Sequence, residues 1–189
     1  DWSSDVCSSD LQGKIAAIVD DGPTQVGVES TVVDMAADVP TILRPGAVTQ
    51  QQLEDVLGIH VLDATSTMSV ADDVTPKAPG MKYRHYAPDK QVVMFDRLDA
   101  LALKVSLAPT DVVMAQEETL QRMALPLAQT WSLGTTLENA TEQLFAGLRY
   151  YDDVAHVKTI YVEKMPPIGL GKAFNNRLGK ASGNQEYQG

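Results

Sequence analysis

The residues best suited to chemistry are cations and aromatic rings that alternate within one short stretch. Lys82, Tyr83, Arg84, His85 and Tyr86 follow one another without interruption. Prolines on both sides of them restrict the backbone and favour an extended conformation. Successive side chains of an extended segment point to opposite sides, so this stretch would present its cations and rings in a fixed order. Cations bind phosphates and flat rings stack on bases, which suits a polyanion that carries a purine.

The same stretch, residues 77–88, is also open to a simpler interpretation as a linker. It lies between two segments whose patterns each indicate compact α/β structure, and its aromatic side chains could pack on the nearer of the two. Linkers that only span a distance are rich in Gly and Ser or carry charges of one sign, and this stretch has neither composition. On the residues alone, the ligand-binding strap and the packed linker both remain open.

Two hydroxyl side chains and an arginine are the other candidates. Ser30 and Thr31 lie in the middle of a predicted strand, where a hydroxyl is usually only a tolerated polar group. Arg44 ends another predicted strand, just before Pro45-Gly46, and a surface arginine is the simplest interpretation. A fixed cation beside a glycine turn, which lets a backbone approach closely, is also suited to a phosphate.

One glycine-rich sequence, Gly169-Leu-Gly-Lys172, has the letters of a phosphate loop but not the spacing. Pro166 stands where the first glycine of that loop belongs, and Ala173 replaces its Ser or Thr. Phe174 occupies the last glycine position of a dinucleotide fingerprint. We therefore predict a structural turn here. No set of Ser, His and Asp can be argued for nucleophilic catalysis, so the catalytic residues stay unknown.

The composition of the 189-residue chain bounds the possible functions. A hydrophobic content of 44% allows a real core, and no apolar run approaches the ~18 residues of a membrane span. A net charge of −10 argues against a broad nucleic-acid footprint. The single cysteine, Cys7, and the lack of a visible secretory signal fit a reducing cytoplasm. His60, His85 and His156 lack metal-ligand spacing, so we predict no zinc site built by the protein.

The first part of the chain is predicted to form a small sheet with one helix. Thr49 and Gln52 make a capping box and Gly58 is a typical helix stop, which predicts a helix over residues 50–57. A sheet this small, covered by one helix, leaves a face open and needs a structural partner. Strands are predicted over residues 14–20, 26–35, 40–43 and 59–62.

Strands and helices alternate after Pro88, which indicates a parallel sheet with helices on its faces, a Rossmann-like arrangement. Residues 91–181 are expected to fold without the rest. Thr135 and Glu138 predict a second capping box at the start of the clearest helix. That helix carries an apolar stripe of Leu137, Thr141, Leu144, Phe145 and Leu148. The other expected elements are strands over 91–95, 111–115, 129–133 and 157–163 and helices over 98–107, 118–125 and 171–180.

Four blocks of sequence have a recognisable order. They are Asp21-Gly-Pro-Thr-Gln-Val-Gly-Val-Glu-Ser-Thr-Val-Val-Asp34, Ile42-Leu-Arg-Pro-Gly46, Lys77-Ala-Pro-Gly-Met-Lys-Tyr-Arg-His-Tyr-Ala-Pro88 and Gly169-Leu-Gly-Lys-Ala-Phe-Asn-Asn-Arg-Leu178. Together they resemble the two-domain threonylcarbamoyl-AMP synthases, the YrdC-like enzymes with an additional C-terminal domain. The resemblance extends from about Gly13 to about Ala181.

The resemblance implies a division of the chain. Residues 12–63 would be the end of a YrdC-like α/β catalytic domain, 64–90 an interdomain linker or lid, and 91–182 a Rossmann-like C-terminal domain. We expect residues 1–11 to be a non-native or disordered leader and 183–189 a tail. The basic K-x-R motif of the family's N-terminal half has no counterpart here. The chain is therefore expected to be an N-terminally truncated fragment that is inactive alone.

The resemblance also implies an activity and its site residues. Such enzymes make threonylcarbamoyl-AMP and pyrophosphate from L-threonine, bicarbonate and ATP, and a downstream transferase complex uses the product to modify tRNA. This is nucleotidyl transfer, for which Mg²⁺ is expected on the ATP phosphates without identified protein ligands. A non-catalytic nucleotide-sensing or interaction module with a Rossmann-like core is the alternative. The implied residues are Ser30 and Thr31 for L-threonine, and Arg44, Tyr83, His85 and Tyr86 for ATP.

Overall fold

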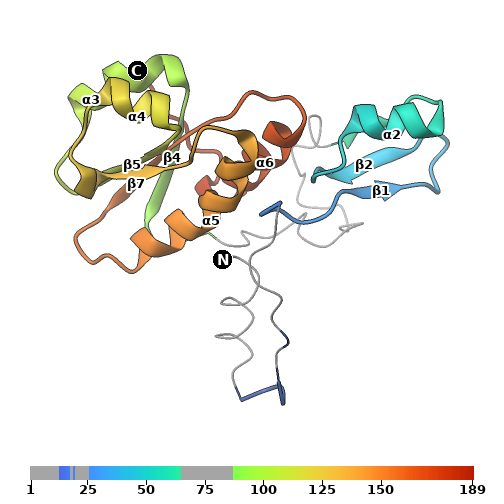
Figure 1. Ribbon diagram of the computed structural model, residues 1–189, viewed down its shortest axis with the longest axis horizontal. Coiled ribbons are helices and arrows are strands. Elements are labelled where there is room, and N and C mark those ends of the chain that lie inside the picture. Colours follow the sequence, from blue (N-terminus) through green and yellow to red (C-terminus); the bar gives the residue numbers. More distant parts are fainter. Residues whose placement is uncertain (1–12, 18, 20–25, 65–86) are drawn as a thin grey trace.

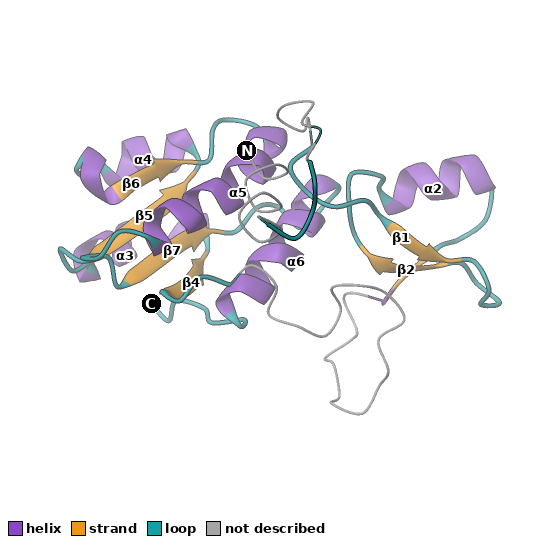
Figure 2. Ribbon diagram, turned by 90° about the horizontal axis from the view of Figure 1, so that it is seen from below, coloured by secondary structure: helices purple, strands orange, loops and turns teal. Residues whose placement is uncertain are grey.

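The computed structural model describes residues 13–17, 19, 26–64 and 87–189. Within these residues the chain forms two parts, a three-stranded sheet with one helix and a larger domain on a four-stranded sheet (Figure 1). We call residues 26–64 the small unit and residues 87–189 the large domain. Helix α6 (Leu170–Ser182) of the large domain lies on the side that faces the small unit (Figures 1 and 2).

The small unit is a sheet of three short strands. β1 (Val32–Asp34) runs antiparallel to β2 (Thr41–Arg44), which runs parallel to β3 (Leu62–Asp63). Helix α2 (Gln50–Leu57) connects β2 to β3 and has no buried residue. The expectation that this small sheet and its helix need a further structural partner stays a prediction.

The start and end of α2 confirm the predicted capping residues. The Thr49 side chain accepts a hydrogen bond from the Gln52 backbone, and the Gln52 side chain accepts one of 2.9 Å from the Thr49 backbone. Gly58 follows the helix in the left-handed conformation, with φ of 66°. These contacts satisfy backbone groups that the helix itself leaves without partners.

Two strand predictions in the first part of the chain differ from the structure. The described residues between 14 and 20 form no strand, and the strand predicted over 26–35 is shortened to β1. Gly27 explains why no strand begins at residue 26, because its φ of 64° is not compatible with an extended strand. A Cβ atom at Gly27 would lie 2.7 Å from the backbone of Glu142, so this segment docks on the large domain instead of extending the sheet.

The large domain contains the predicted parallel sheet. Its strands are β4 (Gln91–Phe95), β5 (Asp111–Ala115), β6 (Thr130–Ser132) and β7 (Thr159–Glu163). All neighbouring strands are parallel, in the order β4-β7-β5-β6, so the last strand in sequence lies between the first two. The predicted ends of β4 and β5 agree with the structure residue for residue.

Helices cover both faces of this sheet (Figure 1). α3 (Ala100–Ser106) and α4 (Glu117–Met123) pack on one face, together with Phe95, Val113 and Ala115 of the strands. α5 (Leu137–Asp152) and α6 pack on the other face, over a larger cluster of apolar side chains. Short 3-10 helices over Arg97–Asp99 and Leu127–Gln129 precede α3 and β6. The strand side chains in the larger cluster are Val92, Met94, Val112, Met114, Ile160 and Val162.

The end of the chain folds back beside β4. Met94 donates a hydrogen bond of 2.9 Å to the Gln185 carbonyl and accepts one of 2.8 Å from the Tyr187 backbone. The residues predicted to be a tail therefore add a short stretch of backbone pairing to an edge of the sheet, which would otherwise leave its polar groups open.

Helix α5 begins one residue later than the sequence predicted. Thr136, not Thr135, caps it, and the Thr136 hydroxyl accepts a hydrogen bond of 3.2 Å from the Asn139 backbone. The predicted apolar stripe is confirmed, because all of its members after Leu137 are buried. The capping box of Thr135 and Glu138 was therefore wrong by one position, while the buried face was right.

Replacing each threonine in turn should identify the cap. We expect Thr136→Ala to lower the free energy of unfolding by about 1 kcal/mol, because a backbone N–H of α5 loses its partner. Thr135→Ala should change it by less than about 0.5 kcal/mol, as for other exposed positions. Urea unfolding of both variants measures the difference, and a larger effect at Thr135 would contradict this cap.

Among the described residues, no helix is long and apolar enough to cross a membrane. The same residues contain no group of three or more His, Cys, Asp or Glu side chains placed to hold a metal ion.

Candidate functional site

Two of the predicted site residues lie side by side. Arg44 is the last residue of β2, and Ser30 comes shortly before β1, the strand that pairs with β2. The Arg44 Nε–H donates a hydrogen bond of 3.1 Å to the Ser30 carbonyl, and Nη2 lies 3.5 Å from the Ser30 hydroxyl oxygen. Ser30 is exposed and Arg44 is half-buried. A hydroxyl and a guanidinium therefore stand together at the surface of the small unit.

Thr31 uses its hydroxyl within the fold. The Thr31 Oγ1–H donates a hydrogen bond of 2.6 Å to the Val48 carbonyl, which fastens the segment before β1 to the segment after β2. A Cβ atom at Gly46 would lie 2.4 Å from the Thr31 nitrogen and 2.5 Å from the Glu29 carbonyl oxygen. Gly46 thus permits the close backbone approach that the sequence predicted, but the approaching backbone is that of the protein itself.

A buried arginine from the large domain reaches these two segments. Arg177 of α6 is 4% exposed, and its Nε–H donates a hydrogen bond of 2.5 Å to Glu29 Oε2. Its Nη2 group donates one of 3.1 Å to the Pro45 carbonyl, and Nη1 donates one of 2.9 Å to Asn176 Oδ1. Sequence reasoning selected neither Arg177 nor Glu29 as a site residue. Their positions inside two of the four blocks were the only signal.

Charges interact strongly at this boundary. Burial alone would raise the pKa of Glu29, but the charge of Arg177, hydrogen bonds and the charge of Arg44 together hold it below 4.5. Burial lowers the pKa of Lys180, and the charges of Arg177 and Arg44 lower it further. Charged groups from both parts of the chain therefore influence each other at this boundary.

The ion pair of Glu29 should make stability depend on pH. Because the folded pKa is lowered, the pair contributes its full stability above pH 4.5 and loses it as the pH falls through the lower, folded value. Gln at this position cannot titrate. We expect urea unfolding to show the wild type more stable than Glu29→Gln at about pH 7, and this difference to become smaller at about pH 3. A difference of the same size at both values would contradict the ion pair.

A pocket of about 430 Å³ lies beside this contact, between the small unit and the start of α6. Gly169 and Lys172 contribute to its wall, so the predicted structural turn helps to form a boundary between the two parts. Lys172 Nζ lies 3.1 Å from Asp63 Oδ2, and His60 Nδ1 lies 2.7 Å from Glu54 Oε1. The titratable side chains of the wall thus form pairs with one another.

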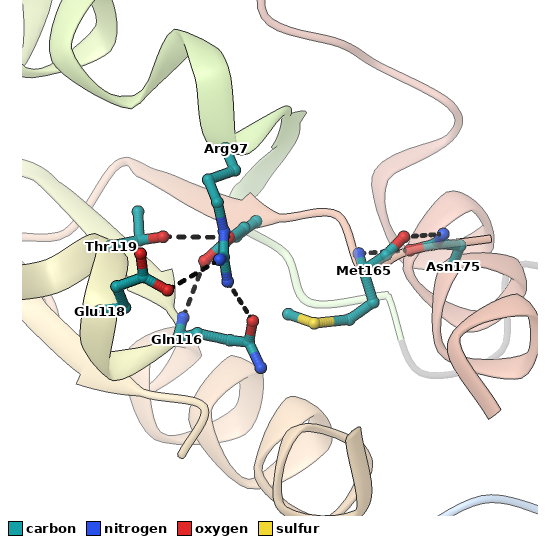
Figure 3. Close-up of polar contacts among 7 residues, drawn as sticks. Arg97, Gln116, Glu118, Thr119, Met165 and Asn175 are labelled. Carbon is teal, nitrogen blue, oxygen red and sulfur yellow. Dashed lines mark hydrogen bonds and ion pairs between the residues drawn. The ribbon is translucent and has the colours of Figure 1, made fainter. Parts of the chain in front are cut away.

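A second polar cluster lies inside the large domain, at the carboxyl ends of its strands (Figure 3). Glu163, at the end of β7, is fully buried and accepts hydrogen bonds of 2.8 Å from Arg97 Nε, 2.8 Å from the Gln116 backbone and 3.0 Å from the Thr119 hydroxyl. Arg97 also donates to Glu118, at 3.0 Å, and to the Gln116 side chain. Internal donors hold the carboxylate, which indicates a structural role.

The other pair in Figure 3 holds the connection from β7 to α6. Asn175 Oδ1 accepts a hydrogen bond of 2.9 Å from the Met165 backbone, and its Nδ2 donates one of 2.7 Å to the Met165 carbonyl. The Asn175 side chain thus binds both backbone polar groups of Met165. This contact fixes the turn at Gly169 against the helix that carries Arg177.

The buried contact of Arg97 with Glu163 should contribute more to stability than its exposed contact with Glu118. We expect Arg97→Met to lower the free energy of unfolding by about 2–3 kcal/mol, because the buried Glu163 loses its only cationic donor in the cluster. Glu118→Gln, at a side chain that is 69% exposed, should change it by less than about 1 kcal/mol. Equal effects in urea unfolding would mean that Arg97 acts only at the surface.

The remaining predicted site residues lie outside the described residues. Tyr83, His85 and Tyr86 belong to the range 65–86, so their place relative to the Ser30–Arg44 pair stays a prediction. Only Ala87 and Pro88 of that block are described.

The fold and the contacts define an α/β protein in which a parallel-sheet domain supports a small unit with a hydroxyl–guanidinium pair. A family model described as the C-terminal domain of threonylcarbamoyl-AMP synthase matches residues 48–183. The chain belongs to the threonylcarbamoyl-AMP synthase family.

Named relatives agree with this family. The threonylcarbamoyl-AMP synthases of Bacillus subtilis and Pyrococcus abyssi are each 37% identical to the chain over 93% of its length. The matches cover 51% and 52% of those proteins, so the chain spans about half the length of these relatives. The crystal structure of P. abyssi Sua5 complexed with L-threonine gives a TM-score of 0.75 at 35% identity, covering 95% of this chain and 53% of that one. The resemblance found in the sequence is confirmed.

Proposed function

We propose that this protein acts in the synthesis of threonylcarbamoyl-AMP and pyrophosphate from L-threonine, bicarbonate and ATP, for modification of tRNA. Family membership supports the reaction, and a relative of similar fold was solved in complex with L-threonine. The observation that carries the proposal for this chain is the contact between Ser30 and Arg44. It puts a neutral hydrogen-bonding group next to a permanent cation, as an amino acid beside a nucleotide phosphate requires.

Each residue of this pair has a separate role in the proposal. The Ser30 hydroxyl binds the polar end of L-threonine, and the Arg44 guanidinium binds a phosphate of ATP through charge-assisted hydrogen bonds. Thr31 contributes by position, because its hydroxyl already donates to Val48. The proposed chemistry is attack of threonine carbamate on the α-phosphate, which depends on placement and charge neutralisation rather than on a side-chain nucleophile.

Magnesium belongs to the nucleotide in this proposal. The phosphates of ATP would hold Mg²⁺, and no ligand in the protein is assigned to it. The ion would neutralise phosphate charge when bound. Arg44 is suited to share that task from the protein side.

The block at residues 77–88 is proposed to close over the nucleotide. Tyr83, His85 and Tyr86 supply the rings for this lid, which would exclude water from a labile carbamate and mixed anhydride. A second solved structure supports the choice: a P. abyssi Sua5 variant with an adjacent histidine and tyrosine replaced by alanine gives a TM-score of 0.76 at 34% identity. His85-Tyr86 is the one adjacent His–Tyr pair in this chain.

Ligand binding by matched variants tests this site. We expect Arg44→Ala to weaken ATP binding about ten- to a hundredfold, because a charge-assisted phosphate contact of roughly 1.5–3 kcal/mol is lost. Ser30→Ala should weaken L-threonine binding and leave ATP binding closer to wild type. Lys104→Ala removes an exposed cation on α3 and serves as the control.

Calorimetric titration with L-threonine and with ATP–Mg²⁺ separates the outcomes. Loss of ATP affinity in Arg44→Ala but not in Lys104→Ala supports the proposal. Failure of the wild type to bind either ligand, or equal affinities in all variants, would overturn it.

A further inference from the structure

Three of the four sequence blocks meet at one side chain. Arg177 lies in the block 169–178 and donates to Glu29, in the block 21–34, and to Pro45, in the block 42–46. Glu29 directly precedes Ser30 and Pro45 directly follows Arg44. Consecutive Cα atoms are only ~3.8 Å apart, so fixing one residue closely limits its neighbour. The Arg177 guanidinium therefore constrains both residues of the proposed ligand pair through their neighbours Glu29 and Pro45.

The support for this guanidinium is rigid. The neighbouring α6 side chains Phe174 and Leu178 are fully buried in the core of the large domain. Asn176 Oδ1 accepts a hydrogen bond from Nη1, so all three guanidinium nitrogens of Arg177 have a partner. A planar guanidinium with donors in fixed directions sets the geometry of its partners, whereas an ammonium group sets only a distance.

We infer that Arg177 is a positioning residue for the proposed reaction: it holds the segments of Ser30 and Arg44 together, so that a residue of the large domain determines ligand binding in the small unit. The inference rests on the proposed function for its two ligands, L-threonine and ATP. We call the contacts of Arg177 with Glu29 and Pro45 the clamp. Without the clamp, binding would first have to order two loose segments, and that loss of entropy would weaken affinity without removing a ligand contact.

The same helix provides a matched comparison. Lys172 also joins the two parts, through its ion pair with Asp63, but it lies by β3 and the pocket rather than behind Ser30 and Arg44. If α6 only attached the small unit to the large domain, loss of either contact would have similar consequences. If Arg177 positions the site, its loss will weaken ligand binding and the loss of the Lys172 contact will not.

The test uses the full chain with Arg177→Lys, Arg177→Gln, Glu29→Gln and, as the control, Lys172→Gln. Arg177→Lys keeps the charge and loses the fork, and Glu29→Gln keeps an acceptor and loses the charge. The first measurement is backbone hydrogen exchange without ligand over residues 28–34 and 42–47. The second is the affinity for L-threonine and for ATP–Mg²⁺.

We expect both Arg177 variants to exchange about tenfold faster in both segments, because local opening becomes easier there. Their affinities for both ligands should fall about tenfold or more. Lys172→Gln should leave these segments and affinities within about twofold of wild type and instead speed exchange near residues 60–64. If Arg177→Gln does not fold, Arg177→Lys and Glu29→Gln decide the result.

Each other outcome counts against a definite claim. Unchanged exchange in Arg177→Lys and Glu29→Gln, or equal effects from Lys172→Gln, would overturn the clamp. Faster exchange with unchanged affinity would show that the clamp is structural and would overturn its positioning role. If the wild type binds neither ligand, the proposed function fails, while the exchange data still decide whether Arg177 orders the two segments.

Discussion

The ion pair between Arg177 and Glu29 joins the two parts of this molecule in a buried position, where an unpaired charge would be most costly. Arg177 is almost fully buried, and the Glu29 carboxylate is ionised below its ordinary pKa. A buried guanidinium without its acceptors would be strongly destabilising, because removing one partner leaves a charge without compensation. The fold can bury Arg177 only if the segments before β1 and after β2 supply those acceptors. The geometry of the small unit is therefore tied to α6.

The small unit needs this external constraint because its own packing is thin. Its strands have two to four residues each, and α2 buries none of its side chains. A sheet of this size holds little apolar area out of water, so specific polar contacts have a large share in fixing its conformation. The large domain is built differently, with a parallel sheet covered on both faces and a core on each side. It provides the rigid body against which the small unit is held.

Local signals in the sequence were sufficient for the elements that local chemistry determines. The capping residues of α2 and the bounds of β4 and β5 were predicted correctly, because caps and short apolar runs depend on neighbours in sequence. The strand predicted over 26–35 is shortened, and it does not begin at residue 26 because Gly27 packs on α5, a contact that the local pattern does not reveal. Arg177 and Glu29 are 148 residues apart, so composition and periodicity could not pair them. Ser30 and Arg44 could be selected by chemistry and family resemblance, but only the structure shows them in contact.

The proposed reaction also suggests why the large domain would matter for a site in the small unit. If the chemistry depends on placement rather than on a side-chain nucleophile, small displacements have large effects; a misplacement of about 1 Å can reduce a rate by about a hundredfold. Loss of the Arg177 contacts would lower stability by a few kcal/mol, which a folded protein can survive. A shift of Ser30 relative to Arg44 would instead separate the amino acid from the phosphate it must reach. Under the proposed function, the buried arginine therefore contributes more through the geometry it imposes than through the stability it adds.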